Sequence, residues 1–401
     1  MHNLKIWNYL SIPWLVFTLT FFIIFFLLAF LVEIDSSYLS KNYLNKLFLN
    51  TVILSFGSAI LSAIIAVPLA ILVTFYKFPG HKFFSWSLSL SIAFPAYVYA
   101  FIYVGIFEYA SPISEYLRGF NITLPQIKNI YGASVIMSMA LFPYIFLLTK
   151  AHLRSVGIKS FKAAKSLGNN NITAIRKVII PSLWPTIIAG MALVVFETIA
   201  DFGGVSTLRI ETFTVGIYDA WFGYQSYFSA TRLAGYLLIF VFLIMFLAKY
   251  FGEKSSNLAS KTAETFQRIE TSPMAGLGVL FFCSFVFIIV FCLPTTQLII
   301  WNLSDSSSNI LSNLQLLFNS SIVGLLASVI TVFFAIALAL SYKHSNILKS
   351  PILISSSGYA IPGSVISAGL LVGVDYIFDT SITFYGILGL IVCLSLRFMT
   401  P

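Results

Sequence analysis

The chain has 401 residues, of which 59% are hydrophobic and 9% are charged, and its formal net charge at pH 7 is +9. A soluble domain carries about a quarter of its residues as charges, so this composition excludes an ordinary water-soluble protein. Many apolar runs reach about 18 residues, which is enough to cross a bilayer, and the alternating pattern of an outer-membrane barrel is absent. Because backbone polar groups must be paired inside the bilayer core, the sequence predicts an all-α polytopic membrane protein.

About ten membrane spans are predicted in chain order. They cover roughly residues 14–32, 47–75, 83–107, 131–150, 183–205, 231–251, 274–298, 314–341, 351–373 and 383–400. The first run resembles a signal peptide, but no small-x-small cleavage site follows it, so we interpret it as a retained span. The cysteines lie singly in apolar runs, where buried hydrophobes explain them better than metal ligands or a disulfide does.

The basic residues indicate how the chain is oriented. With the N-terminus in the cytoplasm and alternating loops, most of the Lys and Arg residues fall on the cytoplasmic side, together with only three acids (Glu253, Glu264 and Glu270). This is the positive-inside bias. It predicts a multi-pass membrane protein with a cytoplasmic N-terminus, and it explains the positive net charge without a nucleic-acid partner.

Two parts of the chain resemble each other in the same order. Asn50 and Asn319, 269 residues apart, each precede an apolar span with a four-residue stripe of small side chains. Ala93–Ala96 then corresponds to Ala360–Gly363, and Tyr131-Gly132 to Tyr385-Gly386. The pattern predicts a tandem parallel repeat.

The repeat divides the chain into a first half (1–251), a cytoplasmic linker (252–273) and a second half (274–401). The second half stops where its own basic loop is expected to begin. We therefore expect the chain to be incomplete at its C-terminal end by about 100 residues or more.

Residues 150–185 form a long, strongly basic cytoplasmic loop. Ser160 is expected to cap a short helix that runs to Leu167, and Gly168 to provide a left-handed turn. A second apolar run then leads to Pro181, where the next span begins. Such a bent unit fits two interpretations: it docks into a groove of a soluble partner, or it lies on lipid headgroups.

The loop resembles the EAA motif of binding-protein-dependent ABC permeases, which is Glu-Ala-Ala, then Gly, then Ile, Leu and Pro at fixed spacing. The matching positions are Lys162, Ala163, Ala164, Gly168, Val178, Ile180 and Pro181. Lys162 departs from the motif, because the family usually has a Glu there that helps to anchor the loop. The resemblance implies a coupling helix in a cleft of an ATPase subunit.

The stretch from Ala192 to Gly223 resembles the ferric-iron importer permeases of the fused two-half type. The matching residues are Thr198, Ala200, Asp201, Phe202, Gly203, Thr212, Phe213, Thr214, Ile217, Tyr218, Trp221 and Phe222. The resemblance implies the type I importer fold with about twelve spans in a full member. It also implies a periplasmic ferric-binding protein and a dimer of ATPase subunits as partners.

Glu197 and Asp201 are one helical turn apart near the end of the fifth span. Acids in lipid are costly, so they are expected to face the bundle interior, where they line a cation path or serve as paired or capping groups. The histidines are scattered and predict no metal site, and no cofactor motif stands out. Because Gly-Lys never occurs, there is no Walker A motif, and ATP hydrolysis is expected in a separate subunit.

The leading hypothesis is thus an ABC permease subunit for ferric iron, which is not itself an enzyme. Fused-half permeases for thiamine, phosphonates or other small solutes share the same loop and stay open as alternatives. An ion-coupled secondary transporter is a different class, for which more charge in mid-membrane is expected. A membrane scaffold without transport is a third. Co-purification with an ATPase subunit separates the first class from the other two.

Overall fold

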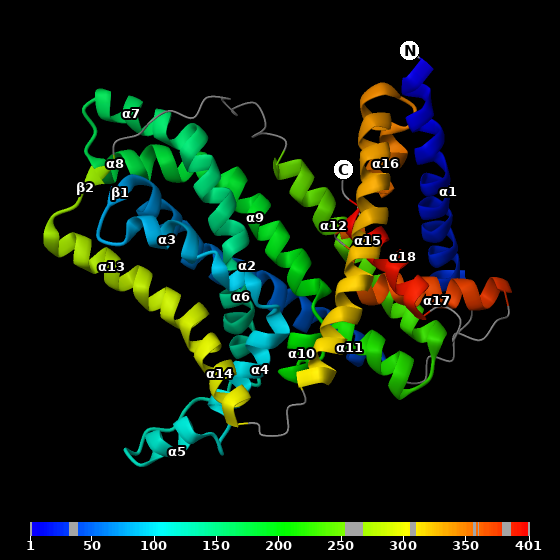
Figure 1. Ribbon diagram of the computed structural model, residues 1–401, viewed down its shortest axis with the longest axis horizontal. Helices are drawn as coiled ribbons and strands as arrows, with labels where there is room; N and C mark the ends of the chain where they lie inside the picture. The colour runs from blue at the N-terminus through cyan, green and yellow to red at the C-terminus, as the bar shows by residue number, and fades with distance from the viewer. Residues whose placement is uncertain are drawn as a thin grey trace. The chain divides into compact units, whose positions relative to one another are not determined.

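The structure is a computed structural model that describes residues 2–31, 39–252, 268–304, 310–355, 358–359, 361–378 and 386–399. These residues are almost entirely helical (Figure 1). Seven of their helices are long and apolar enough to cross a membrane, or eight if one bent pair is a single span. The long helices are α1 (His2–Leu31), α2 (Lys41–Phe75), α6 (Ile130–His152), α8–α9 (Asn171–Ala174 and Ile180–Ala200), α12 (Tyr227–Gly252), α13–α14 (Pro273–Phe287 and Leu293–Ser304) and α15 (Ile310–His344). The predicted all-α polytopic class is confirmed.

The prediction of one continuous span over residues 83–107 is wrong. This stretch forms α3 (His81–Ser87), a 3-10 turn and α4 (Ala96–Phe107), and α5 (Pro112–Arg118) follows. The parts before and after Pro95 meet at 89°. Proline lacks an N–H and disfavours helical geometry in the residue before it, and Phe94 is accordingly extended, with φ −98° and ψ 123°.

The span predicted over residues 351–373 is divided in the same way. Helix α16 (Lys349–Ser355) precedes Pro362, and α17 (Gly363–Phe378) follows it. The carbonyl of Pro95 accepts a hydrogen bond from the Val98 N–H at 2.9 Å, and that of Pro362 accepts one from Val365 at 3.0 Å. The last predicted span contains α18 (Gly386–Phe398), which is only 13 residues long.

The repeat is visible in the helix lengths as well. Helices α2 and α15 each have 35 residues, and they start at the same offset as the sequence match. Each is followed by a short helix, a proline break and a further helix. The division into halves stays a prediction, and linker residues 253–267 lie outside the described residues.

The helices form two compact units. Unit 1 contains Met1–Phe48, Glu211–Phe242 and Asp305–Pro401, and unit 2 contains Leu49–Ile210 and Leu243–Ser304. In unit 1, α1 packs against α15, α16 and α17, whereas in unit 2, α13 and α14 pack against α3 and α4. The opening helix of each predicted half thus packs on elements of the other half.

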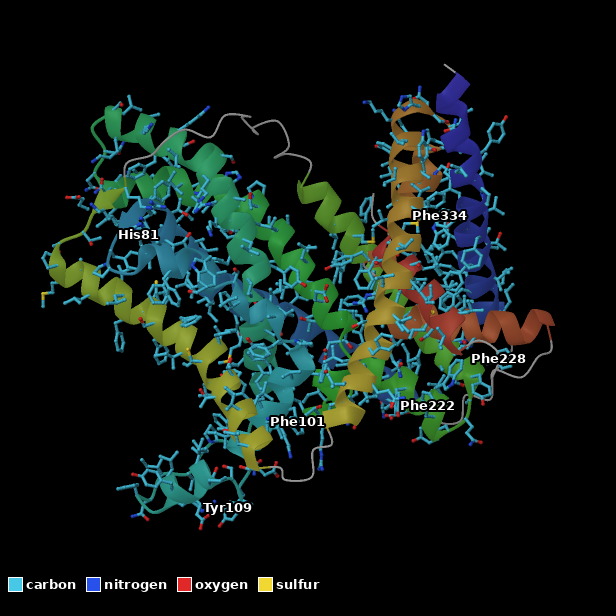
Figure 2. The ribbon with its side chains drawn as sticks, in the orientation of Figure 1. His81, Phe101, Tyr109, Phe222, Phe228 and Phe334 are labelled. Carbon is cyan, nitrogen blue, oxygen red and sulfur yellow. The ribbon has the colours of Figure 1, made fainter. Side chains whose placement is uncertain are left out.

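Unit 1 is held together by aromatic and small polar side chains along α1 and α15. The rings of Trp14 and Phe334 stack with centroids 4.6 Å apart, where Figure 2 labels Phe334 beside α1. One turn away from Trp14, the Ser11 and Ser341 hydroxyls are 3.0 Å apart in a buried hydrogen bond. These contacts fasten the N-terminal helix to the second copy of the repeat.

In unit 2, two tyrosines bridge α4 to the junction between α13 and α14. There the helix passes through a π-turn (Ile288–Cys292), and Pro294 follows. Proline cannot donate to the carbonyls of the preceding turn, which would be left unpaired. The Tyr99 hydroxyl donates to the Val290 carbonyl at 2.5 Å and the Tyr103 hydroxyl donates to Ile289 at 2.7 Å. Pro294 leaves one carbonyl without a donor, the change from π to α geometry leaves a second, and the tyrosines donate to both.

Candidate functional site

The loop between the α6 and α9 spans is a helical hairpin in unit 2. Helix α6 runs through a π-turn (Leu153–Gly157) directly into α7 (Ile158–Ser166). After residues 167–170, α8 continues through a second π-turn (Ile175–Ile179) into α9. The expected cap at Ser160 is wrong, because helical backbone geometry persists from α6 and α7 has no free N-terminus to cap. The helix–Gly–helix arrangement itself is confirmed.

The turn of the hairpin depends on Gly168 and on two asparagines. Gly168 has φ +82°, a left-handed conformation that glycine adopts without a steric penalty. Its N–H donates to Lys165, and the Asn169 side-chain amide donates to the Ala164 carbonyl at 3.1 Å, so the last carbonyls of α7 are satisfied. The Asn170 side chain then caps α8 by accepting from the Thr173 N–H at 2.7 Å.

One face of α7 anchors the hairpin to unit 2. Ile158, Phe161 and Ala164 are buried at three-residue intervals, which places them on the same side of the helix. The ring of Phe161 lies 5.0 Å from that of Phe75 at the end of α2. The anchored face thus follows any movement of α2.

The motif positions fall on both faces of the hairpin. Ala164 is buried, Val178 and Ile180 are half-buried, and Pro181 lies in the first turn of α9. Lys162, Ala163 and Gly168 are exposed. A Cβ built on Gly168 would meet no atom of the described residues within 4 Å, so the space beside this glycine is open.

Two apolar side chains stand out at the tip of the hairpin. Leu167 is 83% exposed and Ile172 is 74% exposed, on either side of the turn. Lys162, Lys165, Arg176 and Lys177 are exposed around them. Sequence reasoning missed this pair, because it assigned both residues to amphipathic helices without knowing which face is covered.

A short strand pair fastens the chain beside this hairpin. Strand β1 (Tyr76–Lys77) pairs in parallel with β2 (Ile269–Glu270). The Lys77 ammonium lies 2.9 Å from the Glu270 carboxylate, and this hydrogen-bonded partner holds the pKa of Glu270 below its usual value. The C-terminal part of the linker is therefore tied to the end of α2, next to Phe75.

The predicted acid pair is arranged differently from the expectation. Glu197 lies in α9, but α9 ends at Ala200 and Asp201 is extended, with ψ 129°, so the two acids do not share a helix face. An Asp201 carboxylate oxygen accepts a hydrogen bond from the Val205 N–H at 3.0 Å and caps α10 (Gly203–Thr207). The helix stops early because α10 turns onto α4: a Cβ on Gly203 would lie 2.8 Å from the Cβ of Tyr97. A role for either acid in a translocation path stays a prediction.

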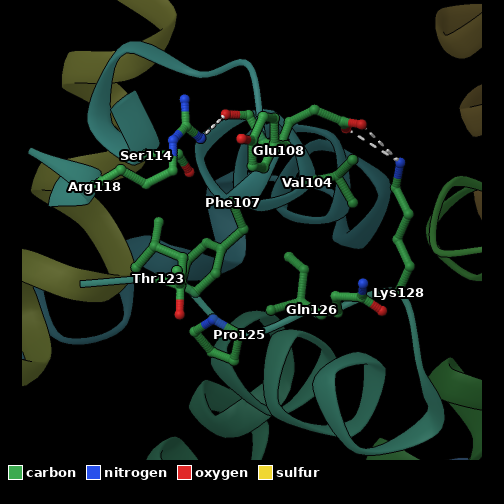
Figure 3. Close-up of a pocket in the computed structure, with 12 residues that line it drawn as sticks. Val104, Phe107, Glu108, Ser114, Arg118, Thr123, Pro125, Gln126 and Lys128 are labelled. Carbon is green, nitrogen blue, oxygen red and sulfur yellow. Dashed lines mark hydrogen bonds and ion pairs between the residues drawn. The ribbon is translucent and has the colours of Figure 1, made fainter. Parts of the chain in front are cut away.

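A cavity of about 390 Å³ lies at the other end of unit 2, between the end of α4, α5 and residues 123–128. Figure 3 shows Glu108 paired with Lys128, at 3.1 Å, and Arg118, whose guanidinium lies over the Tyr109 ring. Figure 2 labels His81 and Tyr109 at opposite ends of this unit. Glu108 and Lys128 are thus paired with each other, and Arg118 is engaged with Tyr109.

Residues 66–257 match the family model described as the binding-protein-dependent transport system inner membrane component. The chain carries a domain of the binding-protein-dependent permease family. This permease domain includes the whole hairpin, Asp201, which caps α10, and the helix break at Pro95. Within the described residues no group of three His, Cys, Asp or Glu side chains is arranged to hold a metal ion.

Curated relatives of the permease domain differ in the substrate that their names state. The Fe(3+)-transport system permease protein FbpB 2 of Haemophilus influenzae is 26% identical over 80% of this chain and 62% of its own length. The sulfate transport system permease protein CysT of Salmonella typhimurium is 26% identical over 39% of this chain and 55% of its own. A putative 2-aminoethylphosphonate permease, PhnU, of the same organism is 24% identical over 38% and 57%. The chain thus spans less than two thirds of each of these relatives.

Proposed function

We propose that the chain is the membrane-spanning subunit of an ABC importer. In this function it passes substrate from a periplasmic binding protein to the cytoplasm by ATP-driven alternating access. The observation that carries the proposal is the α7–α8 hairpin, a rigid bent element with one buried face and an apolar tip. A separate ATPase subunit, as a dimer, hydrolyses ATP.

The hairpin is built to transmit force. Its tip offers Leu167 and Ile172 to a groove of the ATPase, while exposed lysines and arginines around the tip suit an acidic rim. Its buried face reaches α2 through Phe161 and Phe75, and its two arms continue into the α6 and α9 spans. Movement of the tip therefore reaches three spans of unit 2 without an intervening flexible loop.

The proposed orientation places the hairpin and the N-terminus in the cytoplasm of a bacterium. The density of Lys and Arg on this side of the chain supports it. Figure 1 shows α7 and α5 at opposite ends of unit 2, so the α5 region then faces the binding protein. Glu197 and Asp201 lie toward that same outer side and are candidates for the translocation path.

Replacing both tip residues, as Leu167→Ser/Ile172→Ser, is expected to lower association with the ATPase subunit by at least about tenfold. Burying two such side chains in a groove contributes about 1.5–3 kcal/mol each, and serine forfeits most of it. The measurement is the yield of ATPase that co-purifies with the tagged chain. Tyr116→Ser/Ile122→Ser, which changes two exposed apolar residues at the other end of unit 2, is the matched control. Equal yields of ATPase from the tip variant and the control would show that the hairpin is not the coupling element. If the chain were a secondary transporter, no ATPase would co-purify with it.

Ferric iron is the substrate that we propose, because the iron permease aligns over most of this chain whereas the sulfate and phosphonate relatives align over less than half of it. Uptake of ⁵⁵Fe(III), ³⁵S-sulfate and a labelled phosphonate by cells that express the chain with its ATPase and a matching binding protein tests this. We expect ATP-dependent uptake of iron alone. Uptake of an oxyanion instead would leave the importer class intact and change the substrate.

A further inference from the structure

Three cations of unit 2 gather where α3 meets the end of α6. The Lys150 ammonium donates to the Ser85 carbonyl, and the Arg154 guanidinium donates to the Ser85 hydroxyl at 3.3 Å. Arg268, the residue directly before β2, is near enough to Lys150 that its charge acts on it. We call Lys150, Arg154 and Arg268 the α3–α6 cation cluster.

The cluster has no counter-charge among the described residues. The ion pairs there join Lys46 to Glu211, Lys77 to Glu270 and Lys128 to Glu108, and none includes a member of the cluster. The Nε atom of Arg268 is buried without a hydrogen-bond partner. The Ser85 oxygens that accept hydrogen bonds from Lys150 and Arg154 are neutral and do not balance their charges. Cations gathered like this repel one another unless an anion joins them.

The surroundings indicate the level of the membrane surface. Helix α3 presents Phe83 and Trp86, which are 42% and 55% exposed, while Phe84 and Ser85 are buried on its other side. Exposed aromatic rings at the end of a span are typical of the headgroup region, where their rings lie at the boundary between water and lipid. The Phe83 ring also contacts Phe287 of α13, 5.3 Å away, so these rings are fixed in place.

We propose that the α3–α6 cation cluster binds the phosphate group of an anionic phospholipid. Phosphate offers several acceptor oxygens, which arginine guanidinium groups match with paired N–H donors, and lysine adds a point charge. The acyl chains would extend along the exposed rings of α3. Basic pockets between helix ends at a membrane surface bind anionic headgroups in this manner.

The site lies where it would stabilise the break in unit 2. Ser85 belongs to the segment that precedes the 89° bend at Pro95, and Lys150 and Arg154 lie where α6 passes into the hairpin. A bound phosphate therefore links α3, α6 and the residue before β2. Without it, the three cations separate and this end of unit 2 loosens.

The test is native mass spectrometry of the full chain released from nanodiscs that contain equal amounts of phosphatidylglycerol and phosphatidylcholine. We expect selective retention of phosphatidylglycerol by the unaltered chain. Arg154→Gln/Arg268→Gln is expected to weaken this binding about 25-fold, because each cation at a membrane surface contributes about a factor of five. Arg154→Lys/Arg268→Lys keeps the charges and is expected to retain most of the binding, which separates loss of the site from loss of the fold.

Three further measurements complete the design. Lys343→Gln/Lys349→Gln removes two positive charges, one in the last turn of α15 and one at the start of α16, and is expected to leave the bound lipid unchanged. If it lowers binding as much as the arginine variant does, the attraction is diffuse and the site does not exist. Displacement of the lipid by millimolar glycerol phosphate would show that a free phosphate is the ligand. Increased lipid binding in Glu253→Gln/Glu264→Gln would show that the chain's own acids occupy the cluster, and it would overturn the proposal.

Discussion

Gly168→Pro is expected to abolish association with the ATPase subunit while leaving insertion of the chain into the membrane intact. Proline fixes φ near about −65°, whereas Gly168 has φ +82°, so the turn of the hairpin cannot form. The N–H of Gly168, which donates to Lys165, is lost as well. Both effects are confined to the tip, because the arms of the hairpin continue into independent spans. The measurement is ATPase co-purification at equal amounts of membrane-inserted chain.

Gly168→Asn is the matched control for this variant. Asparagine visits the left-handed region more readily than other side chains, and a Cβ at this position has open space around it. It should keep most of the association. If Gly168→Pro co-purifies the ATPase at the yield of the unaltered chain, the hairpin is not the coupling element. If Gly168→Asn fails as completely as the proline variant, the tip needs a bare backbone rather than a left-handed turn.

Tyr99→Phe/Tyr103→Phe is expected to destabilise unit 2 by about 1–6 kcal/mol. Each change leaves one carbonyl of the π-turn before Pro294 without its donor, and an unsatisfied buried polar group costs about 1–3 kcal/mol. The lower end applies if the π-turn relaxes, since hydrogen bonds inside membrane proteins contribute as little as about 0.6 kcal/mol on average. The measurement is thermal unfolding of the purified chain in detergent.

Tyr131→Phe is the control, because this tyrosine is 78% exposed at the start of α6 and its hydroxyl makes none of these bonds. Its unfolding temperature should match that of the unaltered chain. Restoring a donor elsewhere offers a second check: Pro294→Ala supplies the missing N–H and should reduce the effect of the double tyrosine change. An unchanged loss in the triple variant would show that the tyrosines act by packing alone.

Local features of the hairpin could be predicted from the sequence because they depend on local chemistry. Gly168 indicates a left-handed turn through its own conformational preference, and the structure has this turn. The start of α7 could not be predicted in this way. A serine is a good cap only where a helix begins, and here α6 continues through a π-turn into α7, so no helix begins at Ser160.

Features that depend on contacts between distant segments could not be predicted, because the sequence does not show which segments pack together. Pro95 signals a kink, but whether it bends a span slightly or breaks it at 89° depends on what packs against both parts. From the sequence alone, Asp201 is expected in a further turn of α9. The helix ends before it, and Gly203 allows α10 to approach Tyr97. Arg268 lies in the C-terminal part of the linker and comes near Lys150 because two-residue strands pair across 193 positions.

The packing of α1 has a consequence for biosynthesis. This helix emerges first, yet its neighbour α15 starts about 280 residues later. At about 5–20 residues per second, the ribosome needs on the order of a quarter of a minute to a minute to deliver that partner. Lipid must cover α1 in the meantime, which its long apolar run allows. Assembly of unit 1 is therefore postponed until α15 has been made, and a nascent chain arrested before α15 leaves an unpaired helix for membrane quality control to recognise.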